Sequence, residues 1–335
     1  MRSVRVYLMG GTIAARIDEH GNSVTTDLQD FVRQLHEFDG EVTIDVNPFC
    51  KLGGFETRIE DVVRLTNELN RAVREDALDG IVVVMGTNVM EEMAFAIHIL
   101  VPTEIPIVVT GAMRIASAQS ADGPGNLLSA IAVAADRRCR GMGTLVVFNE
   151  EIHSAEYVQK MHSSSTAAFR SEFLLGYVTE GKASIRTRPV KRPLPRLHVE
   201  TDPKDVLLYT TYFSDSGRLV DALWEIPFDG MVVDGTGCGS VPYWILDKLE
   251  KLHQRMPIVI ASRTGHGDVL TATYGAGYGT PQFYVENGYL MAGILDGRKA
   301  RVLLTFLLMS NCTETEIEES FRRYSKDYEG EEIEE

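Results

Sequence analysis

Short apolar runs alternate with amphipathic stretches along the first 150 residues of the chain. The apolar runs have the length of strands and lie at residues 4–9, 42–46, 80–85, 106–110 and 144–148. Stretches with helical periodicity lie between them, at residues 60–76, 90–100 and 126–137. Strands that alternate with helices form parallel sheets covered by helices on both faces, so the pattern predicts an α/β fold. Residues 81–84 are apolar at every position, which is typical of a strand buried on both sides.

The pattern is interrupted by a proline-rich, charged stretch and then begins again. Prolines and basic residues between positions 186 and 205 are typical of an extended linker. Beyond it lie apolar runs at residues 206–209, 230–233 and 257–260, and helical stretches at 298–309 and 313–325. We therefore predict a larger N-terminal α/β domain over residues 1–187, a linker over 188–205 and a smaller C-terminal α/β domain over 206–335. The mostly acidic residues 329–335 are interpreted as a frayed, solubilising tail.

Composition and charge argue against several classes of partner. The chain has 335 residues, 44% of them hydrophobic, and a formal net charge of −15, which disfavours nucleic acid. No stretch approaches the length needed to cross a bilayer, and the first strand begins within a few residues of Met1, so we expect neither a membrane anchor nor a signal peptide. The four cysteines, Cys50, Cys139, Cys238 and Cys312, are far apart. We therefore expect reduced thiols, no metal site and a cytoplasmic location.

The turns that follow the predicted strands hold the candidate chemistry, because ligands of open parallel sheets bind beyond the carboxyl ends of the strands. Three turns stand out, at residues 9–14, 85–92 and 110–114. In the first, the Gly-Gly pair lets backbone amides approach a ligand, and Thr12 directly after it presents a hydroxyl beside a possible oxyanion site. Taken alone, the same turn is also typical of a helix N-cap at Thr12.

A threonine hydroxyl is a weak nucleophile at neutral pH and needs a base or a neighbouring cation. Lys160, in a polar segment after the fifth apolar run, is the candidate cation. A single lysine in a polar loop is also typical of a solvated surface group. The residue types alone therefore leave both interpretations open.

These segments occur together and in order, and the chain resembles the bacterial-type L-asparaginase family of amidohydrolases over nearly its whole length. In the first domain the matching pieces are Gly10-Gly11-Thr12-Ile13-Ala14, Gly86-Thr87 with Glu91-Glu92 and Ala94, residues 110–114, residues 120–124 with Asn126-Leu127, residues 149–155, Lys160, Ala168-Phe169 and Gly176-Tyr177. In the second domain they are Asp229-Gly230, Gly237, Gly239, Ser262-Arg263, Gly265 and residues 299–304.

The resemblance implies a fold and a mechanism. It implies a two-domain asparaginase-like fold, with a parallel-rich sheet flanked by helices in the larger N-terminal domain and a smaller α/β C-terminal domain. Thr12 would be the nucleophile, Thr87 would position the attacking water or assist proton transfer, and Lys160 would be the electrostatic partner of Thr87. The family cleaves a side-chain carboxamide through an acyl-enzyme, without a metal or organic cofactor. Its sites lie between subunits, so we expect a homotetramer or homodimer.

The resemblance also indicates where a small-molecule amide substrate would bind. The expected substrate-binding residues are Gly11, Phe55, Glu56, Gly86, Asn88, Ala112 and Met113.

The sequence departs from the family at the positions that bind the amino-acid head group of the substrate. The second motif normally reads His-Gly-Thr-Asp-Thr, whereas residues 85–89 read Met-Gly-Thr-Asn-Val. The aspartate that would hold the α-ammonium group is therefore Asn88, which removes a full negative charge. Phe55 stands where the family has a serine, and it cannot donate a hydrogen bond to a carboxylate. Glu56 could supply a displaced negative charge or be simply solvated.

Further departures concern groups beside the nucleophile. The family carries a tyrosine in the segment after the nucleophile, yet residues 13–30 contain none. Candidate replacements are Ser23, Thr25 and Thr26. Arg16 could meet a substrate carboxylate or be a surface residue. In the second domain, Cys238 or Ser240 is expected where the family has an asparagine near the neighbouring site.

The chemical positions are thus kept, and the head-group positions are altered. A buried site built for an ammonium group rejects molecules that lack it, and deleting its charge removes that penalty. We therefore predict a threonine-nucleophile amidohydrolase acting on a small amide or cyclic amide or imide, rather than on free L-asparagine. Two alternatives stay open: an ordinary cytoplasmic L-asparaginase or glutaminase in which Asn88 and Glu56 have exchanged roles, and a catalytically inactive ligand-sensing protein on the same fold.

Overall fold

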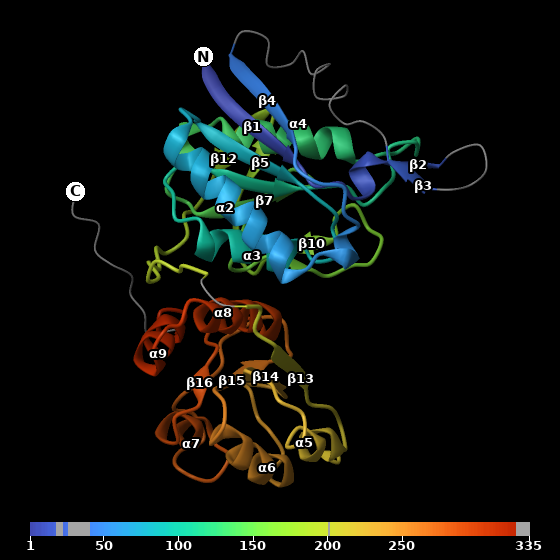
Figure 1. The fold of residues 1–335 in the computed structure, drawn as a ribbon. Helices are drawn as coiled ribbons and strands as arrows, with labels where there is room; N and C mark the ends of the chain where they lie inside the picture. The colour runs from blue at the N-terminus through green and yellow to red at the C-terminus, as the bar shows by residue number, and fades with distance from the viewer. Residues whose placement is uncertain (18–22, 26–40, 200–201, 326–335) are drawn as a thin grey trace. The chain divides into compact units, whose positions relative to one another are not determined.

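The structure, a computed structural model, describes residues 1–17, 23–25, 41–199 and 202–325, without the side chains of residues 14–17 and 23–25. The chain divides into two compact units, Met1–Pro189 and Val190–Glu335 (Figure 1). The bounds predicted for the domains and the linker stay a prediction.

Within the described part of the first unit, eight strands form one sheet in the order β12-β11-β8-β7-β6-β5-β1-β4. They are β1 (Arg2–Leu8), β4 (Val42–Pro48), β5 (Gly80–Val84), β6 (Ile107–Thr110), β7 (Thr144–Phe148), β8 (Glu151–Ser154), β11 (Leu174–Thr179) and β12 (Lys182–Ile185). Strands β4, β1, β5, β6 and β7 run parallel and correspond to the predicted apolar runs. Two short antiparallel pairs accompany the sheet, β2 (Ala15–Ile17) with β3 (Ser23–Thr25) and β9 (Gln159–Lys160) with β10 (Phe169–Arg170).

The sheet is mixed rather than wholly parallel, because the chain reverses direction after β7. Strand β8 pairs antiparallel with β7, β11 with β8, and β12 with β11. Between β7 and β8 lie Asn149 and Glu150, with φ angles of 50° and 64°, as a two-residue hairpin turn requires. A parallel crossover would need about a dozen residues or more, so this short connection produces a hairpin.

Helices cover both faces of the sheet. Helix α4 (Gly123–Ala134) packs against β5, β6 and β7, and its Leu127 belongs to one core with Val6 and Val82. Helices α2 (Ile59–Glu75) and α3 (Met90–Leu100) pack together on the other face, where Tyr7 of β1 donates a hydrogen bond to Glu68 of α2 (Figure 1). Short 3-10 helices lie at η1 (Thr12–Ala14), η3 (Gly54–Glu56) and η4 (Arg137–Cys139).

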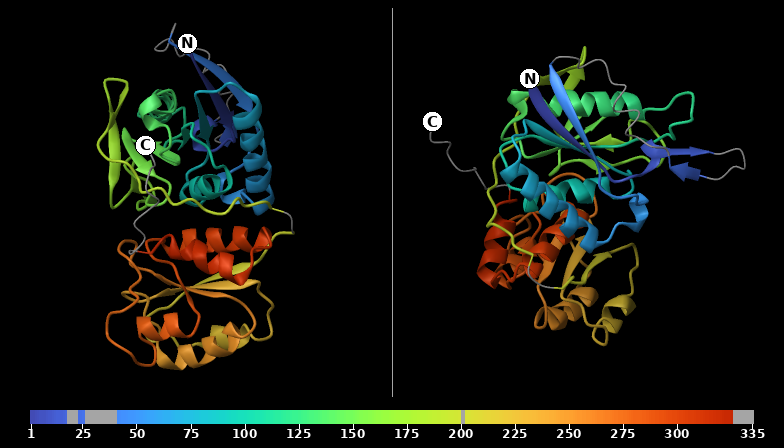
Figure 2. Two further views of the ribbon diagram at one scale, coloured as in Figure 1. Left: turned by 90° about the vertical axis from the view of Figure 1, so that its left-hand side faces the viewer. Right: turned by 45° about the horizontal axis from the view of Figure 1, so that its top comes forward.

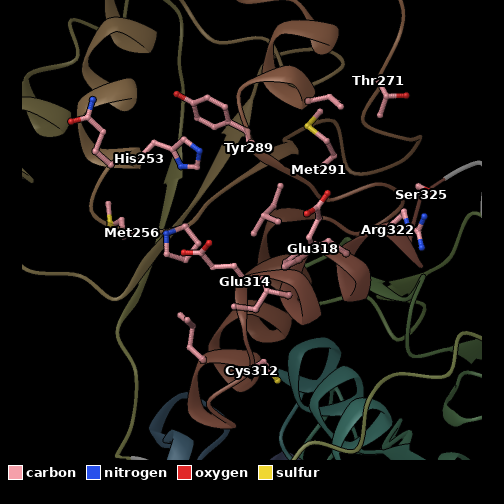
Figure 3. A pocket seen from close by; sticks show the side chains of 18 of the residues that line it. His253, Met256, Thr271, Tyr289, Met291, Cys312, Glu314, Glu318, Arg322 and Ser325 are labelled. Atoms are coloured by element: carbon pink, nitrogen blue, oxygen red, sulfur yellow. The ribbon is translucent and has the colours of Figure 1, made fainter.

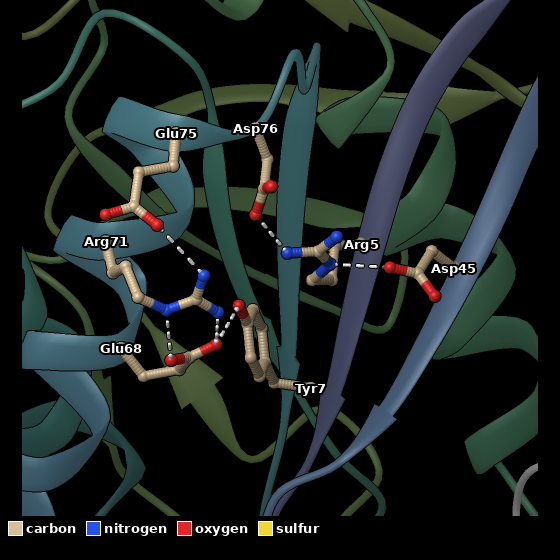
Figure 4. Close-up of polar contacts among 7 residues, drawn as sticks. All are labelled: Arg5, Tyr7, Asp45, Glu68, Arg71, Glu75 and Asp76. Carbon is tan, nitrogen blue, oxygen red and sulfur yellow. Dashed lines mark hydrogen bonds and ion pairs between the residues drawn. The ribbon is translucent and has the colours of Figure 1, made fainter.

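A polar network fixes β1 to its neighbours (Figure 4). The Arg5 Nε atom donates to Asp45 of β4 at 2.6 Å, and its Nη1 atom donates to Asp76 after α2 at 2.5 Å. The Tyr7 hydroxyl donates to Glu68 Oε1 at 3.1 Å. The strand that leads into the first glycine turn is therefore held to both β4 and α2.

In the described part of the second unit, four strands form a parallel sheet: β13 (Val206–Thr210), β14 (Gly230–Gly235), β15 (Ile258–Ser262) and β16 (Leu290–Met291). Helix α8 (Gly297–Met309) packs on one face, and α5 (Arg218–Ala222) and α6 (Tyr243–His253) lie on the opposite face (Figure 2). Helices α7 (Pro281–Glu286) and α9 (Glu314–Arg322) pack against β16. The predicted fold class, with a larger sheet-and-helix N-terminal domain and a smaller α/β C-terminal domain, is confirmed.

Candidate active site

Three loops leave the carboxyl ends of the adjacent strands β4, β1 and β5 and pack backbone to backbone. Gly11 has a φ of 87°, and a Cβ atom added to it would lie 2.4 Å from the Gly86 nitrogen. A Cβ atom on Gly86 would lie 2.9 Å from the Cα atom of Gly54. Only glycine allows so close an approach of main chains. Thr12 and Thr87, which follow Gly11 and Gly86, therefore stand on contacting loops.

Thr12 begins the 3-10 turn η1 and is partly exposed. The next residue, Ile13, is only 3% exposed and lies against Gly123 at the start of α4, where an added Cβ would come within 2.7 Å of the Ile13 Cγ1 atom. Burial of Ile13 anchors the turn and leaves the preceding hydroxyl-bearing residue accessible. The turn can therefore present the Thr12 hydroxyl from a segment that is anchored by packing.

The structure brings Lys160 and Thr87 together across 73 residues of sequence. The Lys160 Nζ atom donates a hydrogen bond to Thr87 Oγ1 at 2.8 Å. Thr87 is 5% exposed and Lys160 is partly buried. Burial lowers the pKa of Lys160, while the charge of Glu91 acts in the opposite direction. A lowered pKa brings the amine nearer to the neutral form, which can accept a proton from a hydroxyl.

The loop after β6 is clamped by the start of α4. Ala112 is 1% exposed and Met113 is partly buried. The Asp122 carboxylate accepts a hydrogen bond from the Met113 amide at 2.9 Å, and Asn126 Nδ2 donates to the Gly111 carbonyl at 3.0 Å. Sequence reasoning assigned no role to Asp122 or Asn126. Their spacing of four residues at the start of a helix, with an aspartate before Gly-Pro, was the available signal.

The head-group positions lie together on the β4 and β5 loops. Phe55 is 77% exposed on η3, and Asn88 is exposed. A Cβ atom on Gly54 would lie 3.4 Å from Asn88 Cβ, so the two loops touch at this point. The Glu56 carboxylate accepts a hydrogen bond from the Gly53 amide at 3.0 Å, which closes its own turn.

Several predicted pocket residues have no described contact with this site. Arg16, Ser23 and Thr25 lie on β2 and β3, and their side chains are outside the described part of the structure, as is the whole of Thr26. Cys238 and Ser240 lie in the second unit, in the turn after β14, with Sγ and Oγ 3.9 Å apart. The roles suggested for these residues stay predictions, and the acidic residues 329–335 also lie outside the described ranges.

Two family patterns match the chain. The pattern described as "Asparaginase, N-terminal" matches residues 3–191, and "Glutaminase/Asparaginase C-terminal domain" matches residues 205–321. This chain belongs to the asparaginase family. The resemblance read from the motifs is confirmed, and so is the enzyme class, a hydrolase of amide C–N bonds.

Relatives of this asparaginase-family chain match it over nearly their full length. An "L-asparaginase" of Bacillus licheniformis is 30% identical over 314 residues, covering 92% of this chain and 96% of the relative. A "Glutaminase-asparaginase" of Pseudomonas aeruginosa is 29% identical over 337 residues, covering 97% and 91% of the two chains. The solved structure of a "Probable Cytoplasmic L-asparaginase" from Campylobacter jejuni superposes with a TM-score of 0.84 at 28% identity, covering 97% of this chain and 100% of that one.

A hollow of about 1230 Å³ in the second unit is lined by a different set of residues, including His253, Tyr289, Met291 and Glu318 (Figure 3). The thiol of Cys312 also lines it, and burial raises the pKa of this thiol. A protonated thiol is a poor nucleophile. The paired hydroxyl and amine of the asparaginase-family motifs therefore remain the better candidates for chemistry.

Over the residues that the structure describes, no three His, Cys, Asp or Glu side chains are grouped so that they could hold a metal ion. None of the helices in the same ranges is long and apolar enough to span a membrane.

Proposed function

We propose that this asparaginase-family enzyme hydrolyses small amides or cyclic imides without a free α-amino group, through an acyl-enzyme on Thr12. The observation that carries the proposal is the identity of the residues at the positions that would bind the α-amino group. Asn88 replaces the family's aspartate, and the carboxylate of Glu56, which could supply a displaced charge, accepts a hydrogen bond from the Gly53 amide. At position 88 an α-ammonium group would therefore meet a neutral amide instead of the ionised carboxylate that makes such a bond strong.

Two other carboxylates of these loops, Asp122 and Glu91, are engaged by the protein's own main chain. Asp122 accepts hydrogen bonds from the Met113 and Arg114 amides, and Glu91 accepts one from the Lys160 amide. Both carboxylates thus have a structural partner within the protein. A substrate whose amino group is absent, acylated or part of a ring places no unpaired charge at this site.

The proposed reaction proceeds in two steps. The Thr12 hydroxyl attacks the amide carbonyl, the C–N bond breaks, and the hydroxyl proton goes to the leaving nitrogen. Backbone amides of the Gly10-Gly11 turn are suited to stabilise the oxyanion, and the pair formed by Thr87 and Lys160 can relay the proton. Water activated by the same pair then hydrolyses the acyl-enzyme and frees Thr12.

A substrate panel tests the proposal. Succinamate is L-asparagine without its amino group, so the ratio of kcat/KM for these two compounds isolates the head group, and N-acetyl-L-asparagine and succinimide extend the comparison. We expect ammonia or acid release from the amino-free members and only weak turnover of L-asparagine and L-glutamine. Turnover of either amino acid at about 10⁴ M⁻¹s⁻¹ or more would refute the proposed specificity.

Asn88→Asp provides a matched variant. A restored carboxylate should shift the kcat/KM ratio toward L-asparagine by about 10- to 100-fold, the worth of one charge-assisted hydrogen bond. Thr12→Ala should abolish turnover of every member of the panel. An unchanged ratio of kcat/KM values in Asn88→Asp would show that residue 88 does not bind the head group of the substrate.

A second candidate function is hydrolysis of L-asparagine or L-glutamine themselves, which the names of the relatives favour. The same panel distinguishes the two functions. A catalytically inactive sensor is disfavoured by the hydrogen bond from Lys160 to Thr87, since ligand binding does not require an activated hydroxyl. A trapped acyl-enzyme, seen as a mass increase that is lost in Thr12→Ala, would exclude the sensor.

We further propose a homodimer or homotetramer in the cytoplasm. The assembly is carried over from the family resemblance. The location is supported by the four cysteines, which all lie in the described ranges and form no disulfide. Because one relative, from Haemophilus influenzae, is named a probable periplasmic L-asparaginase, cell fractionation is the deciding experiment.

A further inference from the structure

Glu91 is a buried acid that the proposed reaction does not use. It is the second residue of α3, is 3% exposed, and its Oε2 atom accepts a hydrogen bond from the Lys160 amide. Thr87 lies four residues earlier and accepts a hydrogen bond from the Nζ atom of the same lysine. One short segment therefore holds Lys160 at both its main chain and the end of its side chain.

The main chain of Lys160 has little other regular structure to hold it. Strand β9 consists of Gln159 and Lys160, and its one partner strand among the described residues is β10. The neighbouring Met161 amide bonds across this pair to the Ala168 carbonyl at 2.7 Å, while the Lys160 amide is bonded to Glu91 instead. A pair of two-residue strands is weakly stable by itself. The bond to Glu91 therefore joins this segment to the largely buried helix α3.

We propose that Glu91 is the positioning residue for Lys160. Its carboxylate holds the Lys160 main chain in the place from which the Nζ atom reaches the Thr87 hydroxyl, and it places a negative charge beside the same lysine. The kinetic part of this inference rests on the proposed function, because it treats Thr87 and Lys160 as parts of the catalytic machinery.

Two opposing influences act on the Lys160 amine. Burial lowers its pKa, and the negative charge of Glu91 raises it. Of the groups that contact Lys160 in the described residues, Glu91 is the charged one and Thr87 contributes a neutral hydroxyl. Loss of the Glu91 charge should therefore move the titration of Lys160 to lower pH.

Two variants separate the charge from the hydrogen bond. Glu91→Gln keeps an oxygen acceptor of the same length and removes the charge, whereas Glu91→Asp keeps the charge and withdraws the acceptor by one methylene. Glu60→Gln is the control, because Glu60 is the second residue of α2, as Glu91 is of α3, and is exposed. The readouts are kcat and KM against pH, and the pH dependence of Lys160 acetylation by limiting acetic anhydride, followed by peptide mass spectrometry.

We expect Glu91→Gln to shift both the Lys160 titration and the matching limb of the kcat profile to lower pH. We expect Glu91→Asp to lose kcat by about 10²-fold, the cost of misplacing a catalytic group by about 1 Å, with KM little changed and no pH shift. Glu60→Gln should change neither the titration of Lys160 nor kcat. Unchanged titration in Glu91→Gln, or wild-type kcat in Glu91→Asp, would overturn the inference.

The acetylation readout keeps the two proposals separable. If the wild-type protein cleaves no amide but the Lys160 titration still shifts in Glu91→Gln, the proposed function fails and the electrostatic role of Glu91 stands. If the wild type is active and the titration does not move in Glu91→Gln, the inference about Glu91 fails and the proposed function stands. Should Glu91→Asp not fold, the titration of Glu91→Gln decides by itself.

Discussion

Replacing Gly11 by alanine tests whether the contact between the two glycine turns sets the catalytic geometry. The added Cβ would lie 2.4 Å from the Gly86 nitrogen and 2.5 Å from its Cα, whereas ordinary van der Waals contact begins near 3.4 Å. The loops must therefore separate by about 1 Å, and a displacement of that size costs about 10²-fold in rate at a catalytic site. The φ of 87° adds strain of about 1–2 kcal/mol for a residue with a side chain. We expect kcat to fall by about 10²-fold, with a smaller change in KM.

Gly125→Ala is the matched control. An added Cβ at Gly125 meets nothing within 4 Å, and the residue lies inside α4. Alanine in a helix interior is favoured over glycine by up to about 1 kcal/mol, so this variant should be at least as stable as the wild type and equally active. The assay is ammonia release from the best substrate of the panel, together with urea unfolding. A Gly11→Ala enzyme with kcat within about threefold of the wild type would refute the argument that this contact positions the catalytic residues.

Two further predictions concern stability. Burial lowers the pKa of His153 to about 4, below the ordinary 6.5, so the unfolded chain takes up a proton first as the pH falls. The free energy of unfolding should then decrease by up to about 3 kcal/mol between pH 6.5 and 4, and His153→Gln should lose this dependence in urea titrations at pH 7.5 and 5. Tyr7→Phe removes the hydrogen bond to Glu68, but Glu68 keeps its contact with Arg71 at 2.7 Å. The free energy of unfolding should therefore fall by only about 1 kcal/mol. Equal pH slopes for His153→Gln and wild type, or a cost for Tyr7→Phe near 3 kcal/mol, would contradict these estimates.

Strands could be predicted from sequence where both of their faces are buried. Residues 80–84 of β5 are buried throughout, and such a strand must be apolar at every position. Strand β11 was missed because exposed residues such as Tyr177 and Thr179 alternate with buried ones, and it therefore forms no apolar run. Pairing direction was hidden as well, since it depends on the connection at Asn149 and Glu150 rather than on the strands.

The sequence by itself determined the kinds of groups available, namely a hydroxyl after a Gly-Gly pair, a second hydroxyl after Gly86, a lysine, and an asparagine in place of an aspartate. Only the tertiary structure decided which of them meet. The bond between Lys160 and Thr87 spans 73 residues, Gly11 and Gly86 touch because their strands are neighbours, and Glu56 binds its own turn. Hydrogen bonds, and the short-range interactions that shift pKa values, operate over a few ångströms. The packing of segments that are distant in sequence sets those distances. Spacing along the chain does not record them, so the role inferred for Glu91 emerged only from the fold.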